Sequence, residues 1–282
     1  DGDAHLQSYT CSIVRNGLSF ILSGGLDVVD LIVVPHACDS LQGLGSILLD
    51  FIHPGKPIVP IYIPRGKRES DINFFKEELW SVFKRLAEVR GSSPSDSEMM
   101  GAVKREEAAD KFLTELFKQR VRLPFPDIEF YRLVRSREYL PGERFVELAQ
   151  DALSGVSNDH QKGIPILMSG IAPEPMEIFD LIARMGGIVV ADDFACSGRR
   201  HYPAGRSEEP MRRMAERILL GPPDSTRSSP LEERIHHLCK LADESGARGV
   251  IFYHIKFCEP ELFYLPGLRK GLENAGIPSV VF

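Results

Sequence analysis

In Val250-Ile-Phe-Tyr-His-Ile-Lys-Phe-Cys258-Glu-Pro260, a buried strand runs into the start of a helix. The run Gly249–Ile255 is apolar and rich in β-branched and aromatic residues, without polar alternation, which is typical of a strand covered on both faces of a parallel sheet. Pro260 suits the first helical turn, because its fixed φ matches a helix and its missing N–H is not needed there. The stretch therefore predicts a strand–helix unit of an α/β protein.

Five further runs share this character, and helical periodicity flanks each of them. They are Leu31–Val34, Pro57–Ile63, Ile164–Met168, Gly187–Val190 and Ile277–Phe282. Alternation of buried strands with helices predicts doubly wound parallel sheets, in which sites form beyond the carboxyl ends of the strands.

The order of these elements predicts three regions. Residues 1–65 form a first α/β domain, which we expect to lack its N-terminal βα unit. Residues 66–158 are charged and periodic at helical spacing, with no convincing strand, and are expected to form a helical insert. Residues 159–282 form a second α/β domain, whose last apolar run stops at Phe282.

Composition excludes several classes of protein. The chain has 282 residues, 43% of them apolar, and a net charge of -6, which argues against nucleic acid or an anionic membrane as a partner. No apolar run approaches the roughly 20 residues that a membrane span needs. The five cysteines are an odd number in a chain too large to need disulfides, so we expect reduced thiols in the cytoplasm.

Three cysteines fall beside expected helix starts. Cys38 and Cys258 each follow a strand, and Cys11 comes three residues after Ser8, a plausible N-cap. A helix N-terminus lowers a thiol pKa, and the thiolate is the form that binds metal. The separations of 27 and 220 residues match no compact ligand motif, so spacing alone gives only a weak prediction of a shared site.

The other two cysteines have simpler interpretations. Cys239 lies on the apolar side of an expected helix, where a thiol is ordinarily a small buried hydrophobe. Cys196 follows a strand and is kept as a reserve ligand.

The segments around these cysteines resemble signature segments of the 2-hydroxyacyl-CoA dehydratase and benzoyl-CoA reductase family, whose subunits are also called the dehydratase D-component. The segments are Gln7-Ser-Tyr-Thr-Cys11-Ser, Pro35-His-Ala-Cys38-Asp-Ser-Leu-Gln42, Met168-Ser-Gly-Ile, Met185-Gly-Gly-Ile-Val-Val-Ala-Asp192-Asp193, Ser197-Gly-Arg199-Arg200, Ile255-Lys-Phe-Cys258-Glu-Pro-Glu261 and Gly276-Ile-Pro-Ser-Val-Val-Phe282. The likeness covers nearly the whole chain, although the helical middle is matched only loosely.

The resemblance implies a fold, a cofactor and an activity. The fold would be two Rossmann-like or flavodoxin-like domains with a helical insert. Cys11, Cys38 and Cys258 would hold a [4Fe–4S] cluster with one iron open. A separate ATP-hydrolysing iron–sulfur activator would supply an electron, which passes to the thioester of an acyl-CoA substrate or, in reductases, into an aromatic ring. A homologous second subunit would complete a heterodimer or homodimer.

Other residues are candidates near this site. Ser169 and Gly170 follow a strand and could hold a thioester carbonyl, with Ser169 as a catalytic candidate, or could form a simple turn. Arg199 and Arg200 could bind CoA phosphates, or an Asp–Arg ion pair could merely shape their loop.

Two histidines and the glycines near Cys38 complete the set. His36 and His254 could donate to a cluster or move a proton, but a structural histidine is the commoner case. Gly43-Leu-Gly45 is no phosphate loop, so no nucleotide is expected on this chain.

Three functions remain open from sequence. The first is an iron–sulfur subunit of a dehydratase or a reductase acting on CoA thioesters. The second is a non-catalytic partner subunit or electron-transfer protein, and the third is an α/β ligand-binding protein with incidental cysteines.

Overall fold

A computed structural model describes residues 2–159 and 161–282, in which six strands form two separate parallel sheets. The strands are β1 (Ile32–His36), β2 (Ile58–Tyr62), β3 (Ile164–Gly170), β4 (Gly187–Phe194), β5 (Gly249–Tyr253) and β6 (Ser279–Val281). Each coincides with one of the six predicted apolar runs, apart from a few residues at the ends. The α/β class with parallel sheets is therefore confirmed.

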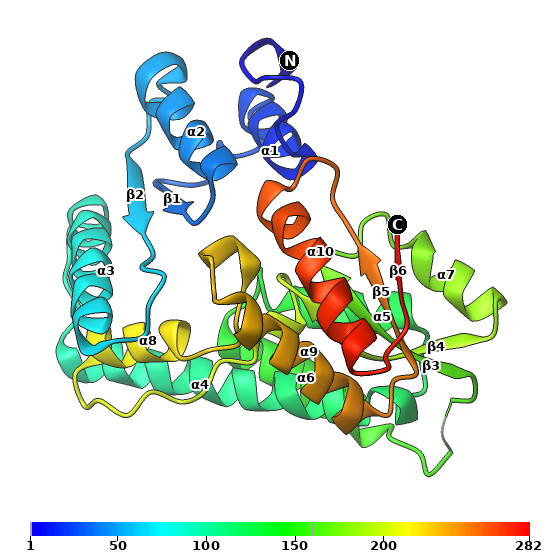
Figure 1. Cartoon of the computed structure of the whole chain (residues 1–282). Helices are drawn as coiled ribbons and strands as arrows, with labels where there is room; N and C mark the ends of the chain where they lie inside the picture. Colours follow the sequence, from blue (N-terminus) through cyan, green and yellow to red (C-terminus); the bar gives the residue numbers. More distant parts are fainter. Residues whose placement is uncertain (1, 160) are drawn as a thin grey trace.

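The helices connect and cover these strands (Figure 1). The α-helices are α1 (Ser12–Leu22), α2 (Asp39–Ile47), α3 (Glu69–Arg90), α4 (Asp96–Gln119), α5 (Asp127–Ser136), α6 (Gly142–Ser154), α7 (Glu177–Arg184), α8 (Pro210–Leu219), α9 (Leu231–Ser245) and α10 (Glu259–Asn274). Short helical turns include η2 (Leu48–Ile52), η4 (Gly198–Arg200) and η5 (Ser225–Arg227).

The first sheet consists of β1 and β2, joined by α2 and η2. The two strands pair in parallel from Ile32 opposite Ile58 to His36 opposite Tyr62. Val34 of β1 packs with Leu44 of α2 in a buried apolar cluster that also takes in the inward face of α1. This part of the fold therefore carries two of the three candidate cysteine segments.

The second sheet has the strand order β4-β3-β5-β6, with every pair parallel. The chain moves outward from β3 to β4 in one direction and then returns to β5 on the other side of β3. This order matches the flavodoxin-like arrangement, whose ligand crevice lies at the point of reversal, between β3 and β5. Cys258 follows β5 at that point.

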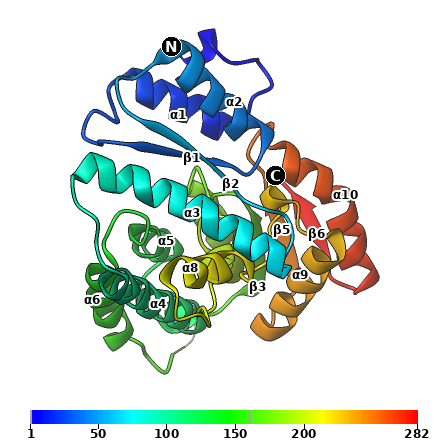
Figure 2. The same ribbon diagram turned by 90° about the vertical axis from the view of Figure 1, so that its left-hand side faces the viewer.

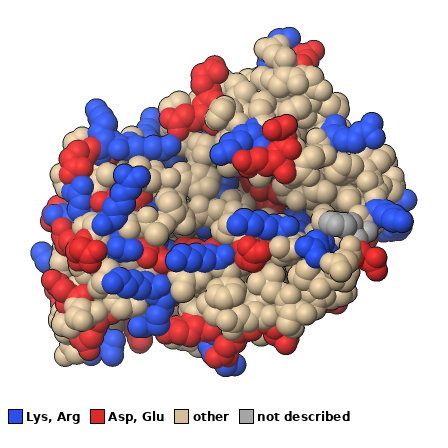
Figure 3. All heavy atoms as spheres, turned by 90° about the horizontal axis from the view of Figure 1, so that it is seen from below, with Lys and Arg blue, Asp and Glu red and all other residues tan. Residues whose placement is uncertain are grey.

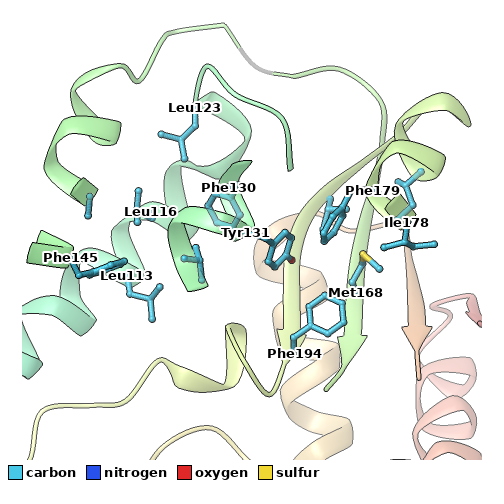
Figure 4. Close-up of a cluster of buried hydrophobic side chains, with 14 of the residues drawn as sticks. Leu113, Leu116, Leu123, Phe130, Tyr131, Phe145, Met168, Ile178, Phe179 and Phe194 are labelled. Carbon is cyan, nitrogen blue, oxygen red and sulfur yellow. The ribbon is translucent and has the colours of Figure 1, made fainter. Parts of the chain in front are cut away.

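Helices cover both faces of the second sheet. On one face, Leu167 and Phe252 pack with Leu238 of α9 and Leu268 of α10. On the other face, α4, α5, α6 and α7 enclose an aromatic core, in which the Tyr131 ring stacks on Phe179 at 4.4 Å between centroids (Figure 4). Alternate residues of β3 point to the two cores, which explains the apolar run Ile164–Met168.

Residues 69–154, all of which the structure describes, contain the helices α3 to α6 and no strand. Helix α3 packs on α8, because Phe75 of α3 belongs to a buried cluster that also contains Ala215 and Leu219 of α8. Figure 2 shows the two helices side by side. The periodicity correctly predicted helices here, including α6, whose N-cap is Pro141. The domain boundaries at 65 and 158 remain a prediction.

The outer surface agrees with the charge of the chain. On the face seen in Figure 3, basic and acidic side chains are interspersed rather than gathered into one basic area. Within residues 2–159 and 161–282, no helix combines the length and the apolar character that a membrane crossing requires.

Gly170 lies where β3 approaches β5 most closely. A Cβ atom at this position would meet the backbone carbonyl oxygen of Tyr253 at 2.1 Å. Because that oxygen belongs to the backbone, neither strand can yield without shifting the sheet. Glycine is therefore required at this position.

We expect Gly170→Ala to lower the free energy of unfolding by about 1–3 kcal/mol, because the new methyl group must push the two strands apart. Urea denaturation measures this change. The control is Gly17→Ala in α1, where no atom lies within 4 Å of the added Cβ. That variant should gain about 0.5–1 kcal/mol from helix propensity. Wild-type stability in Gly170→Ala would contradict the pairing of β3 with β5.

Candidate functional site

Each of the three candidate cysteines is the N-cap residue of a helix. Cys11 caps α1, Cys38 caps α2 and Cys258 caps α10. The predicted position beside helix starts is therefore confirmed for all three. The expected N-cap Ser8 is wrong, because α1 begins later and Cys11 itself occupies the N-cap position. Cys38 and Cys258 follow strands as predicted, whereas the described residues before Cys11 form only a short helical turn, Gly2–Ala4.

The three cysteine segments meet in one place, between the two sheets. Cys11 and Cys258 are each 8% exposed and belong to the same apolar cluster, together with Val34 of the first sheet and Ile255, which follows β5 of the second. A cavity of about 430 Å³ is lined by Thr10, Asp39 and Glu259, the immediate neighbours of Cys11, Cys38 and Cys258. We call this region, defined by these cysteines and neighbours, the cysteine pocket.

Burial and charge both act on the pKa of these thiols. Burial raises the pKa of Cys258 to about 12, opposed by the backbone amide of Glu261, while the negative charges of Cys11 and Cys38 add to the increase. Burial likewise raises the pKa of Cys38, opposed by the amides of Leu41 and Ser40. Each of these amides lies in the first turn of the helix that its cysteine caps.

This outcome corrects one sequence-based expectation. The helix N-termini do lower the thiol pKa, as expected, but the loss of solvation on burial is larger. Without metal, the thiols of Cys38 and Cys258 are therefore protonated at neutral pH. A bound metal reverses this balance, because a coordinating thiol is deprotonated outright.

The chemistry of the donor set is compatible with an iron–sulfur group. In the part of the chain that the structure describes, no three His, Cys, Asp or Glu side chains are grouped to hold one metal ion. An iron–sulfur cluster is held by cysteine thiolates. Three soft thiols in an apolar pocket, each at the positive end of a helix, suit such a negatively charged group.

Cys196 and Cys239 lie elsewhere. Cys196 packs at the edge of the aromatic core, where burial raises its pKa to about 12, and the charges that act on it come from Asp192, Arg135 and Glu138. Cys239 packs against the core beneath α9. The structure brings neither of them into the cysteine pocket.

Ser169 and Gly170 are the last two residues of β3, so the strand is two residues longer than predicted and the alternative of a simple turn does not hold. The strand extends past Met168 because these residues stay paired with Asp193 and Phe194 on one side and with Phe252 and Tyr253 on the other. The buried Ser169 hydroxyl donates to Asp193 at 2.8 Å. Its role toward substrate stays a prediction.

Below the pocket lies a set of buried charges that we call the buried ionic network: Asp193, Arg199, Asp224, Arg234 and Glu261. Arg199 donates to both oxygens of Asp193, at 3.3 and 3.2 Å, and to both oxygens of Glu261, at 2.7 and 3.3 Å. Arg234 donates to Asp193 at 2.9 and 2.6 Å. These two guanidinium groups hold the pKa of Asp193 well below its usual range against the opposing effect of burial.

Arg199, which is 2% exposed, therefore forms the Asp–Arg ion pair that was considered as an alternative to CoA binding for the loop after β4. Arg200 lies nearer the surface, with its guanidinium 3.3 Å from Glu138. Asp192 shapes the same loop, because it accepts hydrogen bonds from the Ser197 hydroxyl at 2.7 Å and the Gly198 amide at 2.9 Å. Contacts of either arginine with CoA stay a prediction.

Sequence reasoning gave no role to Glu261 and missed Arg234 and Asp224. A signal was present in the helices, because Arg234 recurs with Leu238 and Ala242 on the buried face of α9. Glu261 similarly shares the buried face of α10 with Leu268 and Leu272. A charged residue on an apolar stripe predicts a buried partner.

The two candidate histidines are partly buried beside the pocket. The His36 ring lies edge-on to Tyr62, at 4.4 Å between centroids, and the His254 ring stacks over Phe252 at 5.9 Å. His36 Nδ1 and both ring nitrogens of His254 have no hydrogen-bond partner among the described residues. Burial lowers the pKa of His254, opposed by the carboxylate of Glu261, so this imidazole is neutral near pH 7.

Comparisons with known proteins give matches along the whole chain. The family model described as 2-hydroxyglutaryl-CoA dehydratase, D-component, matches residues 1–282. The (R)-phenyllactyl-CoA dehydratase beta subunit of Clostridium sporogenes is 23% identical over 98% of this chain and 75% of its own length. A benzoyl-CoA reductase subunit of Thauera aromatica is 25% identical over 100% of this chain and 75% of its own length. The beta subunit of the (R)-2-hydroxyglutaryl-CoA dehydratase of Acidaminococcus fermentans is 23% identical over 97% of this chain and 75% of its own length.

We expect Asp193→Asn to lower the free energy of unfolding by about 3–5 kcal/mol at neutral pH, because two buried guanidinium groups lose their shared counter-charge. The pKa of Asp193 is depressed in the folded protein, so its contribution is present above the unfolded pKa and is lost as pH falls through the folded pKa. Urea titrations should therefore show a constant gap between wild type and variant from about pH 5 to 8, narrowing below about pH 4.

The control is Glu88→Gln, which breaks the exposed pair with Arg85 and should cost less than about 1 kcal/mol. A pH-independent gap for Asp193→Asn would contradict the ionised state of this carboxylate.

Proposed function

Because the chain belongs to the 2-hydroxyglutaryl-CoA dehydratase D-component family, we propose that it is the part of a CoA-thioester enzyme that holds a [4Fe–4S] cluster. Cys11, Cys38 and Cys258 would be its ligands. The enzyme would be a 2-hydroxyacyl-CoA dehydratase or a reductase of the benzoyl-CoA type, since relatives of both kinds match the chain at similar identity.

One observation carries this proposal: in a chain of this family, three cysteines cap three helices, and the residue next to each of them lines the same cavity. Three protein ligands leave one position of a four-iron cluster open, as a reactive rather than a purely structural centre requires. When bound, the cluster supplies single electrons for the reduction of the substrate.

The residues of the pocket would serve that chemistry by their placement. The positive ends of α1, α2 and α10 offset the negative charge of the thiolates. The apolar side chains of Val14, Leu44 and Ile255 pack around the thiols and keep the local dielectric low. The cavity lined by Thr10, Asp39 and Glu259 lies beside the three cysteines along the chain.

Partners follow from the proposed chemistry and from the relatives. The relatives are named as subunits, which supports a second subunit for this chain. We propose a homologous subunit, a separate ATP-hydrolysing iron–sulfur activator and an acyl-CoA substrate, all in the cytoplasm. The names of the relatives also support thioester chemistry, since each contains an acyl-CoA.

We expect anaerobic reconstitution to load about four iron and four sulfide per chain. Single Cys→Ser changes at Cys11, Cys38 and Cys258 should each lower the iron content strongly, because serine is a poor ligand for iron in such clusters. Metal analysis and visible absorption measure the loading. The matched control is Cys239→Ser, which removes a thiol outside the pocket. Absence of iron from the wild type, or equal loss in the control, would contradict the cluster.

The reaction itself can be assigned by assay. With a partner subunit and an activator, the loaded chain should either dehydrate 2-hydroxyacyl-CoA or reduce benzoyl-CoA, and Cys258→Ser should abolish that activity. Product formation from each thioester is followed separately under anaerobic conditions. Activity with neither thioester, despite a loaded cluster, would favour a non-catalytic electron-transfer subunit.

A further inference from the structure

Glu261 is a buried carboxylate in the first turn of the helix that Cys258 caps. It is fully buried, and it lies three residues after Cys258, so that its backbone amide acts on the Cys258 thiol. An isolated carboxylate in such a place would be strongly destabilising. Its partner is therefore essential to the position of this helical turn.

That partner is Arg199, which approaches Glu261 with two nitrogens. Arg199 Nη1 donates to Glu261 Oε1 at 2.7 Å, and Nη2 donates to Oε2 at 3.3 Å. A bidentate pair of this kind fixes orientation as well as distance, because both groups are planar.

Arg199 is itself held by groups from other elements. Asp193 of β4 accepts from its Nε and Nη2, and Asp224 accepts from Nη1 at 3.2 Å. Asp193 is fixed in turn by Arg234 of α9 and by Ser169 of β3. The first turn of α10 is therefore tied through Arg199 to the carboxyl ends of β3 and β4.

We propose that Arg199 and Glu261 are positioning residues for Cys258, which set where this thiol lies relative to Cys11 and Cys38. The inference deepens the proposed function and rests on it, because a thiol displaced from the other two would serve a shared group poorly. The ionic network also affects the local potential. It places three carboxylates against two guanidinium groups. His237 Nε2 lies 3.4 Å from Asp193, and the charge of Glu261 acts on His254.

The first test uses the metal-free full-length chain and needs no cluster. Iodoacetamide labelling at pH 8.5, with peptide mass spectrometry, gives separate rates for Cys258 and Cys239. The variants Glu261→Gln, Glu261→Asp and Arg199→Lys should each label Cys258 about tenfold faster than wild type, because the helical turn opens locally. The Cys239 rate should stay unchanged.

Glu261→Asp separates geometry from charge, because aspartate keeps the charge but is too short for the same bidentate contact. The matched control is Glu107→Gln, which breaks the bidentate pair with Arg213 at 2.8 and 2.9 Å, away from the pocket. Circular dichroism and thermal melts verify that each variant folds. If Glu261→Gln does not fold, Glu261→Asp and Arg199→Lys still test the proposal.

Three results would overturn the proposal. Wild-type Cys258 labelling in folded variants would show that the ion pair does not hold the turn. A faster Cys258 labelling rate in Glu261→Gln alone would mean that only the charge matters. Equal increases in the labelling rates of Cys258 and Cys239, or a faster Cys258 rate in Glu107→Gln, would indicate a general loosening of the protein.

A second test uses the reconstituted protein. Loss of one negative charge in Glu261→Gln should shift the midpoint potential of the bound cluster to a less negative value, measured by EPR-monitored titration. Arg199→Lys should instead alter the EPR line shape with a smaller shift, because charge is kept. Identical spectra and potentials in all variants would contradict the positioning role. If the wild type binds no iron, the proposed function fails, while the labelling test still decides on the ion pair.

Discussion

The carboxylate of Asp193 accepts hydrogen bonds from Arg199, Arg234 and Ser169 in a site with no exposed side-chain surface. Its neighbours come from β3, η4 and α9, and Arg199 extends the contacts to α10 and to the segment at η5. At the carboxyl edge of a parallel sheet, the chain leaves each strand and must turn into a loop or a helix. In this protein a single buried charge and its two guanidinium partners fix those directions, and the placement of α10 depends on them.

Burial and the backbone amides at the helix start have opposite effects on the pKa of Cys38 and on that of Cys258. The same apolar packing that protects Cys258 also raises its pKa, and the amides at the start of α10 offset only part of the increase. This balance keeps the metal-free thiol in its less reactive form. It also makes ligand binding release protons, so metal affinity in such a pocket depends on pH.

Much of the fold could be predicted from the sequence, because its determinants are local. Strands buried on both faces leave unbroken apolar runs such as Ile164–Met168, and Cys38 and Cys258 lie where strand-like residues give way to helix formers. The predicted end of β3 was wrong because Ser169 is polar, yet its hydroxyl finds Asp193 within the sheet. Arg234 was missed because its partners are set by tertiary contacts, which the periodicity of its own helix does not identify. The convergence of the cysteines followed from family resemblance rather than from spacing.

The origin of the cysteine pocket in two sheets has a consequence for biosynthesis. Cys38 and Cys258 are separated by 220 residues, and Cys258 caps the last helix of the described chain. A partly synthesised chain can therefore fold its first sheet and the helical region while the pocket still lacks one wall. The three thiols meet only after α10 has docked against the first sheet and its helices. A group that takes all three thiols can therefore be bound completely only once α10 is in place.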